Sequence, residues 1–265
     1  MKLERLFLEG CSRLAVIDRS FGNLKKLVSL NLKGCSLLRE LPDLGPMRGL
    51  KELVIDGTSI SQIDFREGFM KKLKILSACD CKHLTKISDS IRNLKSLKYL
   101  TLDGTTIQTL QKSIESLEKL ITLSLKNCTK LTHLPEGIGK LTSLQFLDLS
   151  YTEIQKLPPS VNKLKALKVL RMRHTFIEEF PEDILNLEQL EDIDFSLCGS
   201  LKGTIHYDIW RLSSLAILNL SRTKISGLPP SISRLSRLER LDISRCRKLQ
   251  SLPELPSVSI IRDDN

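Results

Sequence analysis

Aromatic residues are scarce in this 265-residue chain, which contains one Trp and three Tyr and is 5% aromatic overall. Hydrophobic residues nevertheless make up 41% of the sequence, so a core has to be built mainly from Leu and Ile. Such a composition favours a regular aliphatic stack over the mixed core of a conventional globular domain.

Segments that direct a protein into a membrane are also missing. No basic region followed by an apolar stretch opens the chain, and no apolar run approaches the ~20 residues of a membrane-spanning helix. We therefore expect a soluble segment with no membrane span. Leu3 already stands in the register of the pattern described below, so we interpret the sequence as a piece of a longer protein.

Motifs for catalysis, cofactors and metals are absent as well. None of the four histidines, His83, His133, His174 and His206, has Cys or His partners at metal-ligand spacing. The sequence has no G-x-x-x-x-G-K-[ST] phosphate loop, no G-x-G-x-x-G fingerprint and no G-x-S-x-G elbow. We expect this segment to be no enzyme and to bind neither cofactor nor metal.

The net charge of +10 raises the question of a nucleic-acid partner, because phosphate binding needs clustered Lys and Arg. The basic residues are instead spread along the chain and interleaved with apolar positions, as in residues 71–74 and 234–248. This spacing is typical of a solvated face, so we expect no nucleic-acid binding.

A repeat of 23 to 25 residues dominates what the sequence does contain. The pattern L-x-x-L-x-L-x-x-[Cys/Thr] starts at Leu3, Leu27, Leu50, Leu73, Leu97, Leu120, Leu144, Leu167, Leu190, Leu215 and Leu238. Self-similarity at such a period indicates a solenoid whose turns pack on their neighbours. We assign residues 1–252 to this solenoid and residues 253–265 to a carboxyl-terminal tail that leads out of the repeats.

Each repeat has two halves with different hydrophobic spacing. In the first half, as at Leu123 and Leu125, leucines alternate with polar residues, which predicts a short strand with leucines inward. In the second half apolar residues recur every third position, which fits a 3-10 or helical turn. We predict an α/β solenoid of about eleven turns, a horseshoe with a parallel sheet on its concave face and 3-10 or helical segments on its convex face.

The ninth position of every repeat is Cys or Thr. These residues are Cys11, Cys35, Thr58, Cys81, Thr105, Cys128, Thr152, Thr175, Cys198, Thr223 and Cys246. A thiol or hydroxyl is small enough to bury and can donate to backbone carbonyls of adjacent turns, so we interpret the set as a structural ladder. Cysteine turns are one residue longer than threonine turns before the next apolar position, which predicts two alternating turn geometries.

Disulfide bonds between ladder residues are not expected. Neighbouring strands lie ~4.8 Å apart, so cysteines two turns apart are beyond bridging distance, and only Cys11 and Cys35 occupy adjacent turns. Seven thiols without a paired-cysteine cap indicate a reducing, intracellular compartment. Cys79 lies outside the ladder and is interpreted as a surface thiol, its role left open.

The outward positions of the strands predict a binding surface. Tyr99, Phe146 and Tyr151 point outward although aromatics are few, and Tyr and Arg often dominate binding energy at protein interfaces. The candidate partner-binding face on the concave side consists of Tyr99, Asp103, Lys126, Phe146, Asp148, Tyr151, Arg171, Arg173, His174, Asp192 and Asp194. The longer period around residues 199–210 predicts a protruding edge.

Several stretches resemble one family of repeat proteins, among them Asn31-Leu32-Lys33-Gly34-Cys35 and the closing Leu252-Pro253-Glu254-Leu255-Pro256. With the Cys/Thr alternation, they resemble the leucine-rich-repeat region of plant intracellular nucleotide-binding leucine-rich-repeat disease-resistance receptors, especially the Toll/interleukin-1-receptor-type class. The resemblance implies recognition of a pathogen effector or guarded host protein, autoinhibition involving the receptor's own nucleotide-binding domain, and a cytoplasmic or nuclear location.

Two alternatives remain open at this point. An intracellular leucine-rich-repeat scaffold for a signalling protein would be encoded without a nucleotide-binding domain. An extracellular receptor ectodomain would carry glycans at Asn127 and Asn219, which both lie in N-x-[ST] sequons.

Overall fold

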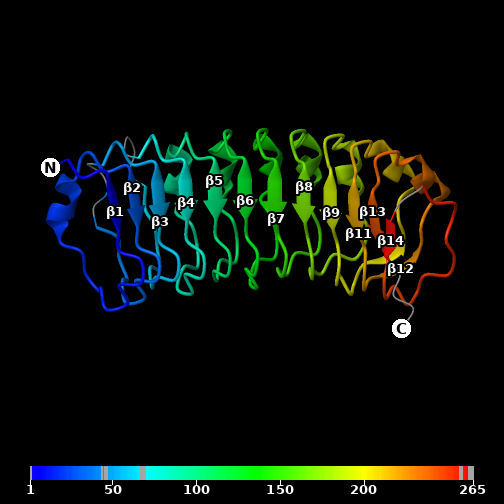
Figure 1. Cartoon of the computed structure of the whole chain (residues 1–265), viewed down its shortest axis with the longest axis horizontal. Helices are drawn as coiled ribbons and strands as arrows, with labels where there is room; N and C mark the ends of the chain where they lie inside the picture. The colour runs from blue at the N-terminus through cyan, green and yellow to red at the C-terminus, as the bar shows by residue number, and fades with distance from the viewer. Residues whose placement is uncertain (1, 43, 45–46, 66–69, 257–258, 262–265) are drawn as a thin grey trace. The chain divides into compact units, whose positions relative to one another are not determined.

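The computed structural model describes residues 2–42, 44, 47–65, 70–256 and 259–261. The chain forms two compact units, Met1–Leu131 and Thr132–Asn265, and each is a stack of similar turns (Figure 1). A short strand recurs from turn to turn and 3-10 segments lie in many of the connections, while no α-helix occurs among the described residues.

In its described part, the first unit has six strands. They are β1 (Arg5–Phe7), β2 (Ser29–Asn31), β3 (Glu52–Val54), β4 (Ile75–Ser77), β5 (Tyr99–Thr101) and β6 (Thr122–Ser124). Consecutive strands pair in parallel and in register, with Leu30 opposite Leu53 and Leu100 opposite Leu123. The 3-10 segments are η1 (Arg19–Asn23), η2 (Asp89–Asn93) and η3 (Lys112–Ser116).

The second unit has a main sheet in which each strand pairs in parallel with the next turn. Its order is β7 (Phe146–Asp148), β8 (Val169–Arg171), β9 (Asp192–Asp194), β11 (Ile217–Asn219), β13 (Arg240–Asp242) and β14 (Ser259–Ile261). The 3-10 segments are η4 (Ile138–Lys140), η5 (Pro159–Lys163), η6 (Glu182–Asn186), η7 (Tyr207–Arg211) and η8 (Pro230–Arg234). The strand β14 lies within the segment that the sequence places in the tail, and it pairs with β13.

The longer repeat around residues 199–210 forms a second, two-stranded sheet. β10 (Lys202–Thr204) pairs in parallel with β12 (Lys224–Gly227) of the following turn, and the register shifts between Gly203 and Thr204. The extra residues of this repeat are therefore held to the next turn by backbone hydrogen bonds.

The core follows the leucine pattern of the sequence. The strands β1–β9, β11 and β13 each begin two residues after the leucine that opens a predicted repeat. The central strand residues Leu100, Leu123, Leu147 and Ile193 are fully buried, so the predicted alternation of inward and outward side chains is confirmed. The predicted stack with a parallel sheet is confirmed as well, and the outer segments are 3-10 because their three-residue spacing matches 3.0 residues per turn.

The ladder residues supply a repeated hydrogen bond at the turn after each strand. The Thr105 hydroxyl donates to the Leu102 carbonyl of its own turn at 2.8 Å, and the Cys128 thiol of the next turn donates to the same carbonyl at 3.2 Å. The same arrangement joins Thr58 to Cys81, Thr175 to Cys198 and Thr223 to Cys246. One carbonyl thus binds two turns together, which gives a physical reason for alternating threonine and cysteine.

Burial of the ladder is nearly uniform. The ladder residues from Cys35 onward are buried, and all seven cysteines are free. Cys11 differs from the expectation because it is exposed. It lies in the turn of β1, the first strand of the sheet in the described part of the chain.

A pair of threonine substitutions tests the shared carbonyl. In Thr105→Val the Leu102 carbonyl keeps the Cys128 thiol as a donor, and we expect a loss of less than about 1 kcal/mol in the free energy of unfolding. In Thr152→Val the Leu149 carbonyl loses its side-chain donor at 2.7 Å, and the next turn has Thr175, which donates to Met172 instead. Here we expect a loss of about 1–3 kcal/mol in urea denaturation. Equal losses for the two variants would contradict the shared-acceptor arrangement.

Candidate functional site

Three of the predicted site residues lie in the first unit. Tyr99 opens β5 and is 41% exposed, and Lys126, just after β6, is also exposed. Asp103 has a structural role, because its Oδ1 accepts hydrogen bonds from the Ser124 hydroxyl and from the Lys126 backbone N–H. Of these three predicted residues, Tyr99 and Lys126 are therefore the ones that remain available to a partner.

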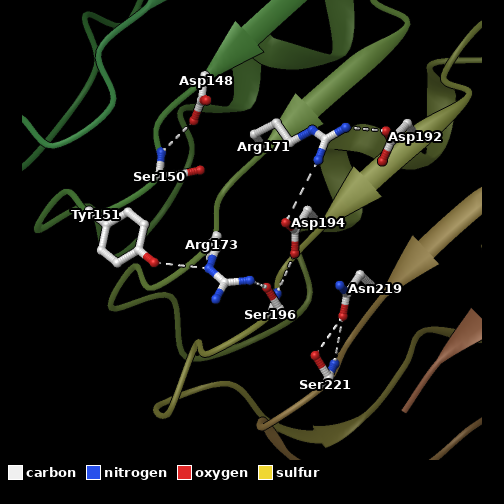
Figure 2. A network of polar contacts seen from close by, with 10 residues as sticks. All are labelled: Asp148, Ser150, Tyr151, Arg171, Arg173, Asp192, Asp194, Ser196, Asn219 and Ser221. Carbon is white, nitrogen blue, oxygen red and sulfur yellow. Dashed lines mark hydrogen bonds and ion pairs between the residues drawn. The ribbon is translucent and has the colours of Figure 1, made fainter. Parts of the chain in front are cut away.

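The other predicted site residues lie in the second unit on β7, β8 and β9 and on the turns that follow these strands. They are Phe146, Asp148, Tyr151, Arg171, Arg173, His174, Asp192 and Asp194. Figure 2 shows Arg171 pointing toward Asp192 and Asp194, and Arg173 toward the Tyr151 hydroxyl. Asp148 contacts Ser150 of its own turn. The structure thus brings together residues that are separated by one or two repeats in the sequence.

Two predicted site residues, Asp148 and Asp194, shape the backbone. Four turns of this unit have Asp or Asn at the strand end and Ser two residues later, and the Asp or Asn Oδ1 accepts a hydrogen bond from the Ser backbone N–H at 2.8–3.0 Å. Three of these contacts are drawn in Figure 2. They turn the chain out of the strand. Asp194 is only 7% exposed, which differs from the expectation of an open contact residue.

The turn after β8 departs from this motif, since Arg171 and Arg173 replace the Asp or Asn and the Ser. A guanidinium cannot accept a hydrogen bond from the backbone, so neither arginine can shape the turn in this way. Arg171 forms a close ion pair with Asp192, and its Nη1 lies 3.9 Å from the Asp194 Oδ2. Arg173 donates to the Tyr151 hydroxyl at 3.0 Å (Figure 2). The absence of the Asp/Asn-x-Ser motif in this turn is therefore the sequence signal that distinguishes these arginines from residues that shape the backbone.

Tyr151 and His174 stand at equivalent positions of successive turns, in the left-handed region with φ of 60° and 55°. Gly10, Gly34 and Gly57 fill this position in the first three turns. A larger residue costs of order 1–2 kcal/mol there, so the strain has to be offset elsewhere in the fold. The two rings stack with centroids 5.2 Å apart. We use the name arginine cluster for Tyr151, Arg171, Arg173, His174 and Asp192.

Asp192 is the acidic member of the arginine cluster. Its Oδ1 is buried and has no hydrogen-bond partner among the described residues. Burial raises the pKa of the Asp192 carboxyl, while the nearby Arg171 opposes this effect. A cavity of about 130 Å³ adjoins it and is lined by further charged side chains, including Arg240 and Asp242. The arginine cluster thus holds a carboxylate with one oxygen paired to Arg171 and the other buried.

Cys79 is half-buried and differs from the surface thiol that the sequence predicts. Its Sγ lies 3.7 Å from the Ser77 hydroxyl, and its backbone N–H donates to the Asp56 Oδ1. Burial raises the pKa of the Cys79 thiol, so the reactive thiolate is scarce at neutral pH. This environment disfavours a redox role.

Comparison with known proteins identifies the fold. Residues 125–206 match the family description "Leucine-rich repeat region", and residues 95–154 match "Leucine rich repeat". The fold is a leucine-rich-repeat solenoid. A chain in the structure of the Drosophila Toll–Spatzle complex has the same fold, with a TM-score of 0.71 and 18% identity, and the match covers 94% of this chain and 35% of that chain.

Part of the leucine-rich-repeat solenoid is homologous to plant disease-resistance proteins. Disease resistance protein RPS4B of Arabidopsis thaliana is 43% identical over 93 residues, which are 35% of this chain and 8% of that protein. Disease resistance protein RPP2A of the same plant is 44% identical over 59 residues, which are 22% of this chain and 4% of that protein. The matched segments thus span less than a tenth of either relative.

The leucine-rich-repeat solenoid is a scaffold for binding proteins. Within the part of the chain that the structure describes, no group of three His, Cys, Asp or Glu side chains is arranged to hold a metal ion. A search of the same residues finds no helix with the length and hydrophobicity needed to cross a bilayer.

Proposed function

We propose that this solenoid is the recognition region of a plant intracellular immune receptor of the nucleotide-binding leucine-rich-repeat class with a Toll/interleukin-1-receptor-type domain. It binds a pathogen effector or a guarded host protein, and it helps to hold the receptor inactive through contact with the nucleotide-binding domain, in the cytoplasm or the nucleus. The observation that carries the proposal is the 43% identity to Disease resistance protein RPS4B over 93 residues.

The arginine cluster is the proposed centre of the binding face, with Phe146, Tyr99 and Lys126 as further contacts. Two observations support this choice. Arg171 and Arg173 take the place of residues that shape the neighbouring turns, and Tyr151 and His174 accept a strained backbone conformation. Arg and Tyr are also the residue types that most often act as binding hot spots.

The extracellular alternative predicts a glycan on Asn219, and the surroundings of this residue disfavour one. Asn219 ends β11, and its Oδ1 accepts hydrogen bonds from both the backbone N–H and the hydroxyl of Ser221. A glycan would be attached to a side chain that is already tied into the turn. The structure therefore disfavours a glycan at Asn219, whereas Asn127 of the other sequon is exposed.

Two experiments test the proposal: sequencing of the full reading frame, and a binding assay between this solenoid and a separately expressed nucleotide-binding domain. The full reading frame should encode a nucleotide-binding domain, and residues 1–265 should coprecipitate with that domain when both are expressed in leaf cells. We expect the variant with Phe146, Tyr151, Arg171 and Arg173 changed to alanine to retain less than about a tenth of this binding, since hot-spot losses exceed 2 kcal/mol.

A matched control changes four exposed residues that lie outside the strands, Lys156, Lys163, Glu179 and Glu188, to alanine. Binding by the control should equal that of the wild type. If the face variant also binds like the wild type, the binding face is misassigned while the receptor proposal survives. A reading frame without a nucleotide-binding domain would refute the receptor proposal and favour the scaffold.

A further inference from the structure

A cavity of about 400 Å³ opens at the turns that follow β9, β11 and β13. Five cationic side chains line it, and its lining in the described part of the chain includes no Asp or Glu. The cations are Arg222, Lys224, Arg245, Arg247 and Lys248. We call this site the basic cavity. It lies on the turns beyond the strand ends, and it shares no lining residue with the arginine cluster.

The charge of the basic cavity is not dictated by the repeat. Arg222 and Arg245 precede the ladder residues of successive turns, and Lys224 and Arg247 follow them. The first three turns have glycine and serine at these two positions. Adjacent turns are in contact, since the Arg222 backbone N–H donates to the Ser244 carbonyl at 2.8 Å. The stack therefore collects side chains that lie 23 residues apart into two short rows of positive charge.

Backbone strain accompanies this charge. Arg222 and Arg245 have φ of 57° and 59°, in the left-handed region, where glycine stands in four of the earlier turns and a larger residue in the other five. Among the described residues, no ion pair joins Arg222, Lys224, Arg247 or Lys248 to a carboxylate. The like charges of Arg222, Lys224, Arg247 and Lys248 repel one another, so a bound anion would stabilise their arrangement.

Gly199 leaves one wall of the basic cavity without a side chain. A Cβ added at Gly199 would meet no atom within 4 Å, so space remains open there. A longer residue can therefore be placed at the cavity lining without displacing the backbone. This gives a way to block the site while all five cations stay in place.

We propose that the basic cavity binds a compact anion that carries two or more phosphate groups. Guanidinium groups bind phosphate through paired hydrogen bonds, and three arginines line the site. Its volume lies within the roughly 300–1,000 Å³ range of small-molecule sites. No aromatic side chain lines the described cavity, so the stacking surface that single-stranded nucleic acids use is missing.

The test is calorimetric titration of the chain with sodium tripolyphosphate at low ionic strength. We expect binding at one site, with an affinity that falls as salt is added. The double variant Arg222→Gln and Arg247→Gln should weaken binding at least about tenfold, because two charge-assisted contacts are lost. Gly199→Glu should weaken it similarly, because its carboxylate would occupy the cavity.

Control variants and a control ligand distinguish binding at the basic cavity from nonspecific attraction between charges. Lys156→Ala with Lys163→Ala removes the same charge from other turns and should leave binding unchanged, and circular dichroism checks that every variant is folded. Citrate is the carboxylate control and should bind more weakly. Unchanged binding in Gly199→Glu, or equal binding of citrate, would overturn the proposal.

Two further probes identify other sources of phosphate. A doubly phosphorylated serine peptide that binds more tightly than tripolyphosphate would assign the site to a modified protein instead of a free anion. A single-stranded oligonucleotide that binds more tightly, and that Gly199→Glu fails to weaken, would reveal a diffuse nucleic-acid surface. Either result would overturn the assignment to a compact free anion.

Discussion

Replacing Phe195 by alanine should lower the free energy of unfolding by about 3–5 kcal/mol. Phe195 directly follows β9, and its ring is fully buried. It packs edge-on against Phe180, with ring centroids 5.7 Å apart. Because strands on both sides pair with β9, we expect the turn to collapse only partly around the cavity. Equilibrium denaturation in urea measures the loss.

The matched control is Phe176→Ala. Phe176 is a phenylalanine of the preceding turn with a side chain that is 49% exposed, so its removal should change the free energy of unfolding by less than about 0.5 kcal/mol. Similar losses for the two variants would mean that the inward and outward sides of the turns are misassigned.

Gly139→Ala should destabilise the protein by about 3 kcal/mol, at the upper end of overpacking effects. Gly139 lies in η4, where an added Cβ would stand 2.1 Å from the Ser160 carbonyl oxygen and 3.0 Å from the Lys163 Cβ. The carbonyl belongs to the backbone, so the clash is relieved only by separating two stacked turns. Thermal denaturation should show a clear fall in Tm.

Gly199→Ala is the control for this substitution. No atom lies within 4 Å of the added Cβ, and the φ of Gly199 is outside the left-handed region. We expect an unchanged or slightly raised Tm, because alanine restricts the unfolded chain. If Gly139→Ala were equally harmless, the close approach of η4 and η5 would be wrong.

The fold could be predicted from the sequence because the spacing of apolar residues within each repeat determines the secondary structure of that repeat. Alternating leucines at Leu123 and Leu125 set a strand, and three-residue spacing sets the outer turn. The small sheet of β10 and β12 was not predicted, since backbone pairing between turns needs no particular side chain. The same reason applies to β14, which joins the sheet without the leucine pattern.

The candidate site was harder to predict. Asp148 and Asp194 look like exposed charges in the sequence, but their roles depend on backbone N–H groups two residues away. The basic residues look dispersed along the chain because Arg222 and Arg245 are 23 positions apart, and only stacking brings them together. Side-chain contacts between adjacent turns are thus the part of the candidate site that the sequence of a single repeat does not predict.

The central claim is that successive turns stack and bury the Cys/Thr ladder, and alkylation of the native cysteines with iodoacetamide tests it most directly. Burial raises the pKa of the Cys81, Cys128 and Cys198 thiols, which slows their reaction further. Peptide mass spectrometry should find Cys11 modified first and Cys79 slowly. Protection should persist until unfolding at Cys35, Cys81, Cys128, Cys198 and Cys246. Modification of these five thiols at the rate of Cys11 in the folded protein would contradict the stacked structure.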